Sequence, residues 1–181
     1  MNIIVLDTET TGLLVPMASS IDKQPFIVEL YAIKLDKDLK RTEMLSFRCK
    51  PPIPIPEKAT LIRGISNEDV SNGHPSVSYL ETLSKFFLNT DILVGHNVIY
   101  DATVLYCELV RLGKTMQFPW PYKNVCTVEI AQQQFGSRRT LADLHMELFG
   151  VSFDGAHNAA TDCQVTAKCF VEMVSREWIT L

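Results

Sequence analysis

Two acidic residues stand two positions apart directly after an apolar run, Ile3 to Leu6, near the N-terminus. In an extended chain alternate side chains point to the same face, so Asp7 and Glu9 lie together and Thr8 lies opposite. Two ionised carboxylates repel each other unless a cation lies between them, and a hard divalent cation is the usual one. The pair therefore predicts a metal-binding edge; the alternative for these residues alone is a strand that ends in an acidic turn.

Two later segments place acidic residues near the starts of predicted helices. Asp101 follows a short apolar strand, 91–95, and Asn97 lies four residues before it. Asp162 lies in the first turns of the last predicted helix, five residues after His157. In a continuous helix these two side chains would point about 140° apart, so they converge only if His157 lies in the loop before the helix. Functional sites gather at strand-to-helix junctions such as the one before Asp101. The alternative for Asp101 alone is a helix-dipole contact. The alternative for the last segment alone is a solvated histidine and an ordinary first-turn acid.

The elements that must position these residues follow from the hydrophobic pattern. Strand formers predict strands over 26–35 and 44–50, besides the first strand and the strand 91–95. Helical spacing predicts helices over 57–63, 75–88, 99–112, 127–135, 140–149 and 159–178. Early strands followed by interleaved helices predict an α/β fold, in which a mixed sheet that starts as a three-strand meander is flanked by helices. The length of 181 residues predicts a single domain, 1–181.

The composition narrows the class of protein further. With 46% hydrophobic and 21% charged residues, the composition is that of a soluble globular domain. The sequence has no stretch like a membrane span and no signal-peptide core, so it predicts a cytoplasmic protein. Five cysteines without a CxxC pair argue against a disulfide framework and a zinc ribbon. The net charge of -4 excludes a broad basic face for long duplexes. A nucleic-acid role would need a small local site where metal ions supply positive charge.

Taken together and in this order, the acidic segments resemble the DEDDh subgroup of the DnaQ-like 3′-to-5′ exonucleases, which includes the proofreading subunit of bacterial DNA polymerase III. The main motifs are DTETTGL (7–13), VGHNVIYD (94–101) and HNAATD (157–162), and secondary matches are IVELYAI (27–33), LIRGIS (61–66) and RTLADL (139–144). The resemblance covers nearly the whole chain and implies an RNase H-like fold. Tyr100 and Cys163 depart from the commonest pattern, and the segment 14–25 is longer than the minimal family loop.

The resemblance also implies roles for individual residues. Two divalent ions, Mg²⁺ or Mn²⁺, would be held by four catalytic carboxylates, Asp7, Glu9, Asp101 and Asp162. His157 would take the proton from the attacking water. Substrate contacts would come from Thr10, Leu13, Ile62, Asn97 and Tyr100. For Leu13 and Ile62 the alternative is an ordinary place in the core.

The expected reaction is hydrolysis of phosphodiester bonds at the 3′ ends of DNA, with single strands favoured and nucleoside 5′-monophosphates released, in proofreading or repair. A DNA polymerase is the expected protein partner. The nearest alternative enzyme is an RNA 3′-exonuclease, such as an oligoribonuclease or an RNase T-like trimmer, because the carboxylates do not read the 2′-hydroxyl. The alternative from another class is a polymerase-associated binding module, although such a module has no need of clustered like charges.

Overall fold

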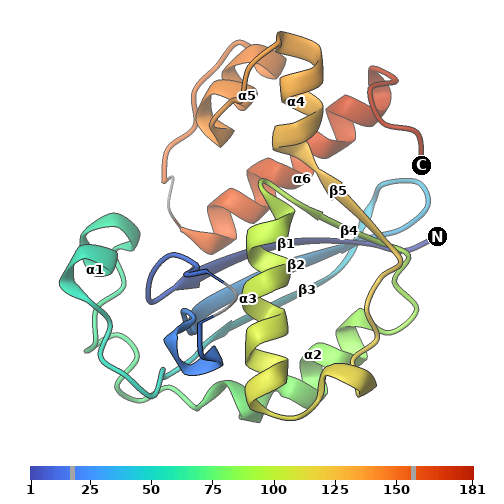
Figure 1. Cartoon of the computed structure of the whole chain (residues 1–181). Coiled ribbons are helices and arrows are strands. Elements are labelled where there is room, and N and C mark those ends of the chain that lie inside the picture. The colour runs from blue at the N-terminus through green and yellow to red at the C-terminus, as the bar shows by residue number, and fades with distance from the viewer. Residues whose placement is uncertain (17–18, 156–157) are drawn as a thin grey trace.

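A five-stranded mixed sheet forms the centre of the molecule in a computed structural model, which describes residues 1–16, 19–155 and 158–181 (Figure 1). Its strands are β1 (Ile3–Thr10), β2 (Ile27–Leu35), β3 (Arg41–Arg48), β4 (Ile92–Gly95) and β5 (Lys123–Cys126). The strand order is β3-β2-β1-β4-β5. Strands β1, β2 and β3 form an antiparallel meander, and β4 and β5 run parallel to β1. The predicted mixed sheet with its opening meander is therefore confirmed.

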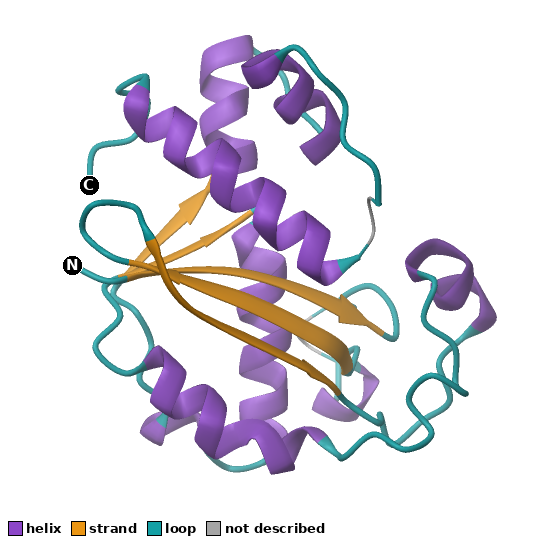
Figure 2. Ribbon diagram, turned by 180° about the vertical axis from the view of Figure 1, so that it is seen from behind, coloured by secondary structure: helices purple, strands orange, loops and turns teal. Residues whose placement is uncertain are grey.

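Helices cover both faces of this sheet, as Figure 2 shows from behind. The α-helices are α1 (Glu57–Arg63), α2 (Leu80–Phe87), α3 (Val98–Arg111), α4 (Thr127–Phe135), α5 (Leu141–Phe149) and α6 (Ala159–Ser175). Short 3-10 helices span Ile21–Lys23, Ser76–Tyr79 and Thr115–Gln117. One core cluster joins the sheet to α4, α5 and α6, and another joins it to α2 and α3. Helix α1 stands apart, beyond the C-terminal end of β1 (Figures 1 and 2).

The alternation of side chains along β1 assigns each of its residues to one of these two cores. Ile3 and Val5 pack in the cluster with α6, whereas Ile4 and Leu6 pack in the cluster with α3. Because the strand continues to Thr10, the same alternation carries past the apolar run into the acidic residues. The odd-numbered positions 7 and 9 therefore face α6, and the even-numbered positions 8 and 10 face α3.

The main difference from the sequence prediction is β5, which the sequence analysis left out. It has only four residues, KNVC, and only Val125 and Cys126 are buried, so it lacks a run of strand formers. The segment becomes a strand because it pairs in parallel with β4. Strand β3 runs from Arg41 to Arg48, whereas the sequence predicted a strand over 44–50, and the start of the helix predicted over 75–88 is a 3-10 turn. Helix α1 ends before Gly64, as predicted, because that glycine takes a left-handed φ of 68°.

The long segment after β1 is anchored at its base, although residues 17–18 lie outside the described part. The Gln24 side chain accepts from Val15 N at 3.1 Å and donates to Val15 O at 3.0 Å. Arg111 of α3 donates to Gln24 O at 2.6 Å and to Ile21 O at 2.9 Å, and it stacks on Phe26. Helix α3 therefore holds the described ends of this segment beside the start of β2.

Two further findings concern the composition. All five cysteines are free and buried. Across the described residues, every helix is too short or too polar to cross a membrane.

Candidate active site

Three carboxylates from β1 and α6 meet at the C-terminal end of β1. Asp7, Glu9 and Asp162 each offer one ligand oxygen, and these oxygens lie within 4.8 Å of one another. The alternation of β1 turns Asp7 and Glu9 toward α6, and Asp162 lies in the first turn of that helix. The helix begins where the side chain of Asn158 accepts from Thr161 N at 3.1 Å. Residues far apart in sequence are thus brought to one point by a strand end and a helix start.

Asp101 reaches the same edge from the opposite face of the sheet. Its Oδ1 accepts from Thr8 N at 2.9 Å and from Thr8 Oγ1 at 2.7 Å. Thr8 can do this because it points toward α3, the helix that carries Asp101. Asp101 does not belong to the group of three ligand oxygens, yet its charge is the largest single electrostatic influence of a neighbouring residue on Asp7. The structure therefore gathers three predicted carboxylates closely and sets the fourth beside them.

The electrostatics of this cluster fit a divalent metal ion. Burial raises the pKa of Asp7 well above its usual range, and the charges of Asp101, Glu9 and Asp162 raise it further. Burial also raises the pKa of Glu9, and it raises the pKa of Asp101 to about 7 although Thr8 donates to its carboxylate. Carboxylate oxygens are the ligands that Mg²⁺ and Mn²⁺ prefer, and such an ion would favour the ionised form of every member. The donor set therefore suits these ions.

A cation missed by the sequence analysis also enters the cluster. Arg63, at the end of α1, donates from Nη1 to Glu9 Oε2 at 2.6 Å, and both side chains are largely buried. Its charge partly offsets the rise that burial causes in the pKa of Glu9. The only sequence signal was the motif LIRGIS, in which Arg63 itself was given no role.

The predicted general base, His157, lies outside the described residues. Helix α6 begins at Ala159, after His157 in the chain. The role of His157 stays a prediction.

The predicted substrate residues Thr10 and Tyr100 meet in the turn after β1. Thr10 Oγ1 donates to Gly12 O at 2.7 Å, Tyr100 Oη donates to the same oxygen at 2.7 Å, and the two hydroxyl oxygens lie 2.6 Å apart. Tyr100 N in turn donates to Asn97 O at 2.8 Å. Asn97 precedes α3 in a left-handed conformation with a φ of 77°, and its side chain is exposed. These contacts fix the backbone of the turn against the start of α3.

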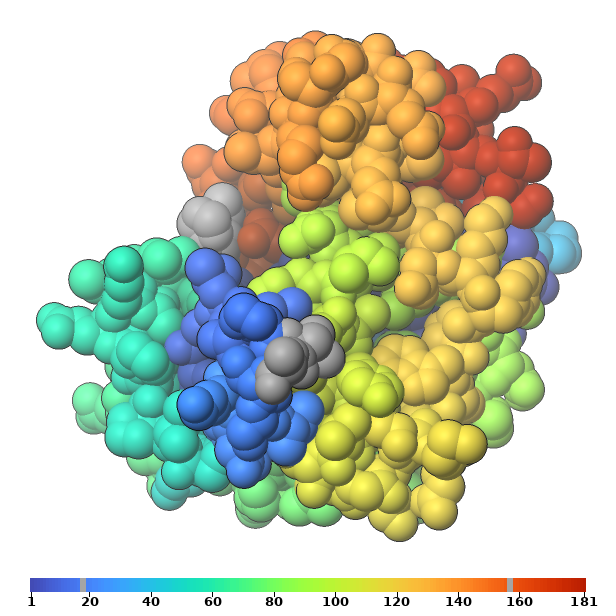
Figure 3. Space-filling view, in the orientation of Figure 1, coloured from blue at the N-terminus to red at the C-terminus, as the bar shows by residue number. Residues whose placement is uncertain are grey.

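Two predicted apolar contacts lie at the surface. Leu13 is 78% exposed and Ile62 is 55% exposed, so the alternative that they are core residues is wrong. Leu13 lies in the turn after β1 and Ile62 lies in α1, and these two segments stand side by side on one face of the molecule (Figures 1 and 3).

Cys163, the departure from the family pattern next to Asp162, points into the core, where its thiol donates to Val5 O.

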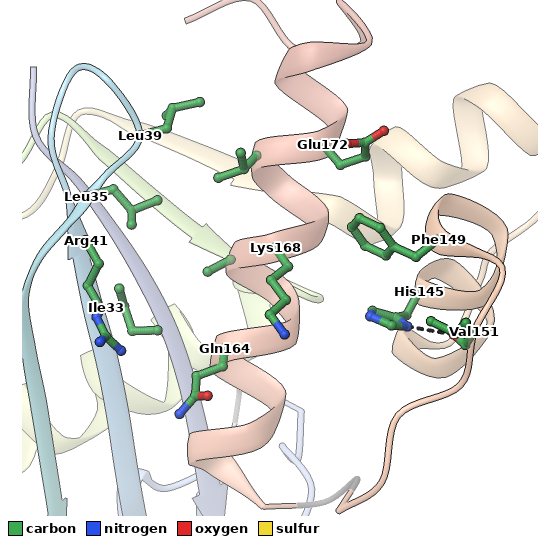
Figure 4. A pocket seen from close by; sticks show the side chains of 12 residues that line it. Ile33, Leu35, Leu39, Arg41, His145, Phe149, Val151, Gln164, Lys168 and Glu172 are labelled. Carbon is green, nitrogen blue, oxygen red and sulfur yellow. Dashed lines mark hydrogen bonds between the residues drawn. The ribbon is translucent and has the colours of Figure 1, made fainter.

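A cavity of about 660 Å³ lies away from this cluster, between β2 and the helices α5 and α6 (Figure 4). It is bordered by Ile33, Leu35, Phe149 and Lys168, and His145 at its edge contacts Val151 O through Nδ1. None of the four carboxylates lines it. The chemistry of the acidic residues therefore belongs to the open end of β1, not to this cavity.

The fold and the carboxylate cluster together define a nuclease-like domain, and comparison with known proteins identifies its class. A family model described as exonuclease, RNase T type, matches residues 4–170, so the chain belongs to this exonuclease family. It is 29% identical over 180 residues to the DNA polymerase III subunit epsilon of Aquifex aeolicus, which covers 97% of this chain and 81% of the relative. The predicted membership of an exonuclease family is thereby confirmed.

Other relatives are much longer. The chain is 31% identical over 168 residues to the PolC-type DNA polymerase III of Clostridium perfringens, which covers 91% of this chain but 11% of that protein. The chain therefore spans about a tenth of the length of this curated relative. Among solved structures, exonuclease X in complex with 5′ overhanging duplex DNA covers 98% of this chain and 94% of its own, with a TM-score of 0.69 and 21% identity. This likeness confirms the RNase H-like fold.

Proposed function

We propose that this chain is a DEDDh-type 3′-to-5′ exonuclease that removes nucleoside 5′-monophosphates from the 3′ ends of DNA. The observation that carries the proposal is the group formed by Asp7, Glu9 and Asp162, whose ligand oxygens lie within 4.8 Å of one another. Asp101 completes the set of four carboxylates from the neighbouring position. The likeness to a DNA polymerase III subunit epsilon over 97% of the chain supports DNA as the substrate.

The four carboxylates would hold two divalent ions, Mg²⁺ or Mn²⁺. Such ions, when bound, lower the pKa of an attacking water and stabilise a leaving oxygen. Thr8 holds the Asp101 carboxylate in place through two hydrogen bonds, so its orientation is set before substrate arrives. His157 would accept the proton of the water, since an imidazole with an ordinary pKa near 6.5 is suited to that task at neutral pH.

The residues beside the carboxylates would position the terminal nucleotide. The turn fixed by Thr10 and Tyr100 presents backbone and hydroxyl groups next to the end of β1. Leu13 and Ile62 expose apolar side chains on the two neighbouring segments, which suits contact with a base. Asn97 would support the start of α3 behind this turn.

The same relatives support a proposal for the setting of the activity. We propose a single domain over residues 1–181 that acts in the cytoplasm, in proofreading or repair, on single-stranded 3′ ends. A DNA polymerase is the proposed partner, because one relative over almost the whole chain is named DNA polymerase III subunit epsilon and another is named DNA polymerase III PolC-type.

Digestion of matched single-stranded DNA and RNA, labelled at the 5′ end, tests the proposal. With Mg²⁺ or Mn²⁺ we expect stepwise shortening of the DNA, and we expect chelator and Asp7→Ala to abolish it. Asp38→Ala, a change on the exposed hairpin between β2 and β3, should leave it unchanged. Shortening of RNA alone would replace DNA by RNA as the substrate. If a folded, metal-loaded parent shortens neither polymer, the catalytic proposal falls and a binding module takes its place.

A further inference from the structure

Arg63 links a surface helix to the carboxylate cluster. Its Nη1 lies 2.6 Å from Glu9 Oε2, and the side chains of Arg63 and Glu9 are 15% and 6% exposed. Arg63 is the last residue of α1, and the left-handed Gly64 turns the chain away directly after it. The guanidinium is therefore held in the site by its place at the end of α1 and by its charged hydrogen bond to Glu9.

Glu9 does not use all the donors of this guanidinium. Arg63 Nε is buried, and among the described residues it has no hydrogen-bond partner. Leaving a buried N–H of a charged group unpaired is costly. A guanidinium presents a planar fork of donors that matches phosphate oxygens in pairs. The Tyr100 hydroxyl also interacts with the Arg63 side chain, so the donor left over by Glu9 and Tyr100 is Nε, and a phosphodiester oxygen is the kind of acceptor that it would take.

Arg63 also lies where a polyanionic substrate needs a positive charge. The chain carries a net charge of -4, and four carboxylates gather at this point. On the same short helix Leu61 and Ile62 are 80% and 55% exposed. Helix α1 therefore offers apolar surface for a base and a guanidinium for a phosphate within three consecutive residues.

A metal ion and Arg63 would compete for one carboxylate. Glu9 is a member of the group whose oxygens suit a metal ion, and Arg63 holds one of its two oxygens. An ion with two positive charges at Glu9 would repel the guanidinium and weaken its hydrogen bond. Binding of the ion would then leave the fork of Arg63 available to another anion.

We propose that Arg63 is a phosphate-binding residue of this site, held by Glu9 until a metal ion takes that carboxylate and then turned to the 3′-terminal phosphodiester of the substrate. The inference rests on the proposed function, because it takes the end of a nucleic acid as the ligand.

Calorimetric titration with Mn²⁺ alone tests the competition. We expect Arg63→Gln to bind Mn²⁺ about tenfold more tightly than the parent, because Glu9 no longer has a cationic partner. Arg176→Gln is the matched control, since it removes a 2.8 Å pair with Glu172 near the C-terminal end of α6. This control should keep the affinity of the parent. Equal or weaker binding of Mn²⁺ by Arg63→Gln would overturn the competition.

The salt dependence of oligonucleotide binding tests the phosphate contact. Binding of a labelled single strand is followed by fluorescence anisotropy in Ca²⁺, with a gel to verify that the strand stays intact. Loss of one phosphate contact should reduce the slope of log Kobs against log salt concentration by about 0.7 for a single strand. We expect this change in Arg63→Gln, whereas Arg63→Lys keeps the charge and the slope. A strand with a neutral methylphosphonate at its 3′-terminal linkage should bind the parent and Arg63→Gln with equal slopes.

The outcomes separate this inference from the proposed function. If the parent binds the strand but a folded Arg63→Gln keeps the full slope, Arg63 is not a phosphate contact and only the inference falls. If Arg63→Gln does not fold, Arg63→Lys is measured in its place. Lysine keeps the positive charge, so the slope should stay that of the parent. A reduced slope in a folded Arg63→Lys would overturn the inference. If the parent itself does not bind the strand, the proposed function falls together with the inference.

Discussion

Replacing Asp101 with asparagine should change how the stability of the metal-free protein depends on pH. Asp101 is 4% exposed, and burial raises its pKa from 3.8 to about 7. A carboxyl whose pKa is raised by folding binds its proton more tightly in the folded chain than in the unfolded chain. The free energy of unfolding therefore falls as the pH rises from the pKa of the unfolded chain to the pKa of the folded chain. Above the folded pKa, the stability that was lost does not return.

The size of this loss of unfolding free energy follows from the pH range over which the carboxyl is ionised in the unfolded chain but protonated in the folded chain. Between about pH 5 and pH 8 the unfolded carboxyl is ionised throughout, whereas the folded one loses its proton near pH 7. Two pH units at about 1.36 kcal/mol each give a loss of about 3 kcal/mol from Asp101. Burial raises the pKa of Asp7 as well, so Asp7 adds a loss of the same sign. For a domain of ordinary stability, about 5–15 kcal/mol, this effect is large.

Urea unfolding in chelator at the two pH values measures the effect in the parent and in Asp101→Asn. The asparagine keeps an acceptor oxygen for Thr8 but cannot ionise, so we expect a smaller fall with pH. In Asp38→Asn, an exposed change on the β2–β3 hairpin, the free energy of unfolding should fall with rising pH as much as it does in the parent. Saturating Mg²⁺ should reduce the fall in the parent, because an ion bound only by the folded site favours its ionised form. An equal fall in the parent and Asp101→Asn, or stability that rises with pH, would refute the reasoning.

Three further substitutions test the surroundings of the site. Tyr100→Phe removes the donor to Gly12 O, so steady-state digestion should show KM about fivefold higher and kcat nearly unchanged; a lower kcat at constant KM would argue against a positioning role. Thr8→Val removes the 2.7 Å bond to Asp101, and turnover should fall about tenfold while the circular dichroism spectrum stays that of the parent; full turnover would show that this bond does not matter. Arg111→Met leaves the buried Glu108 without its cationic partner, so urea unfolding should show a loss of about 3–5 kcal/mol, and a loss below about 1 kcal/mol would contradict the anchoring.

The parts of the site that depend on local geometry could be predicted from the sequence. A period of two places Asp7 and Glu9 on one face of β1 whatever surrounds the strand, and the structure turns both toward α6. The end of α1 at Gly64 is equally local, because a glycine readily takes the left-handed conformation found there. The convergence of Asp162 with this pair needed the order of all the motifs, since Asp162 lies 153 positions after Glu9.

The remaining parts depend on packing between distant segments. Thr8 and Asp101 are 93 positions apart, and Arg63 and Glu9 are 54 positions apart, so neither hydrogen bond has a signal in local spacing. Strand β5 was missed for the same reason, because its short and half-polar sequence becomes a strand only beside β4. The surface position of Leu13 and Ile62 also had to come from the structure, since apolar residues of this kind are usually buried.

The most direct test of the central claim compares the rates of four amide variants with that of one matched control. Asp7→Asn, Glu9→Gln, Asp101→Asn and Asp162→Asn each remove one carboxylate charge with little change of shape. Glu29→Gln does the same at the cross-strand neighbour of Glu9, outside the group of metal-suited oxygens. Metal ions contribute several kcal/mol to catalysis, so kcat/KM for a 5′-labelled single strand in Mg²⁺ should fall at least about a hundredfold in each of the four and only a few-fold in Glu29→Gln. Near-parental turnover in any of the four, or an equal loss in Glu29→Gln, would contradict the assignment of the active site to these carboxylates.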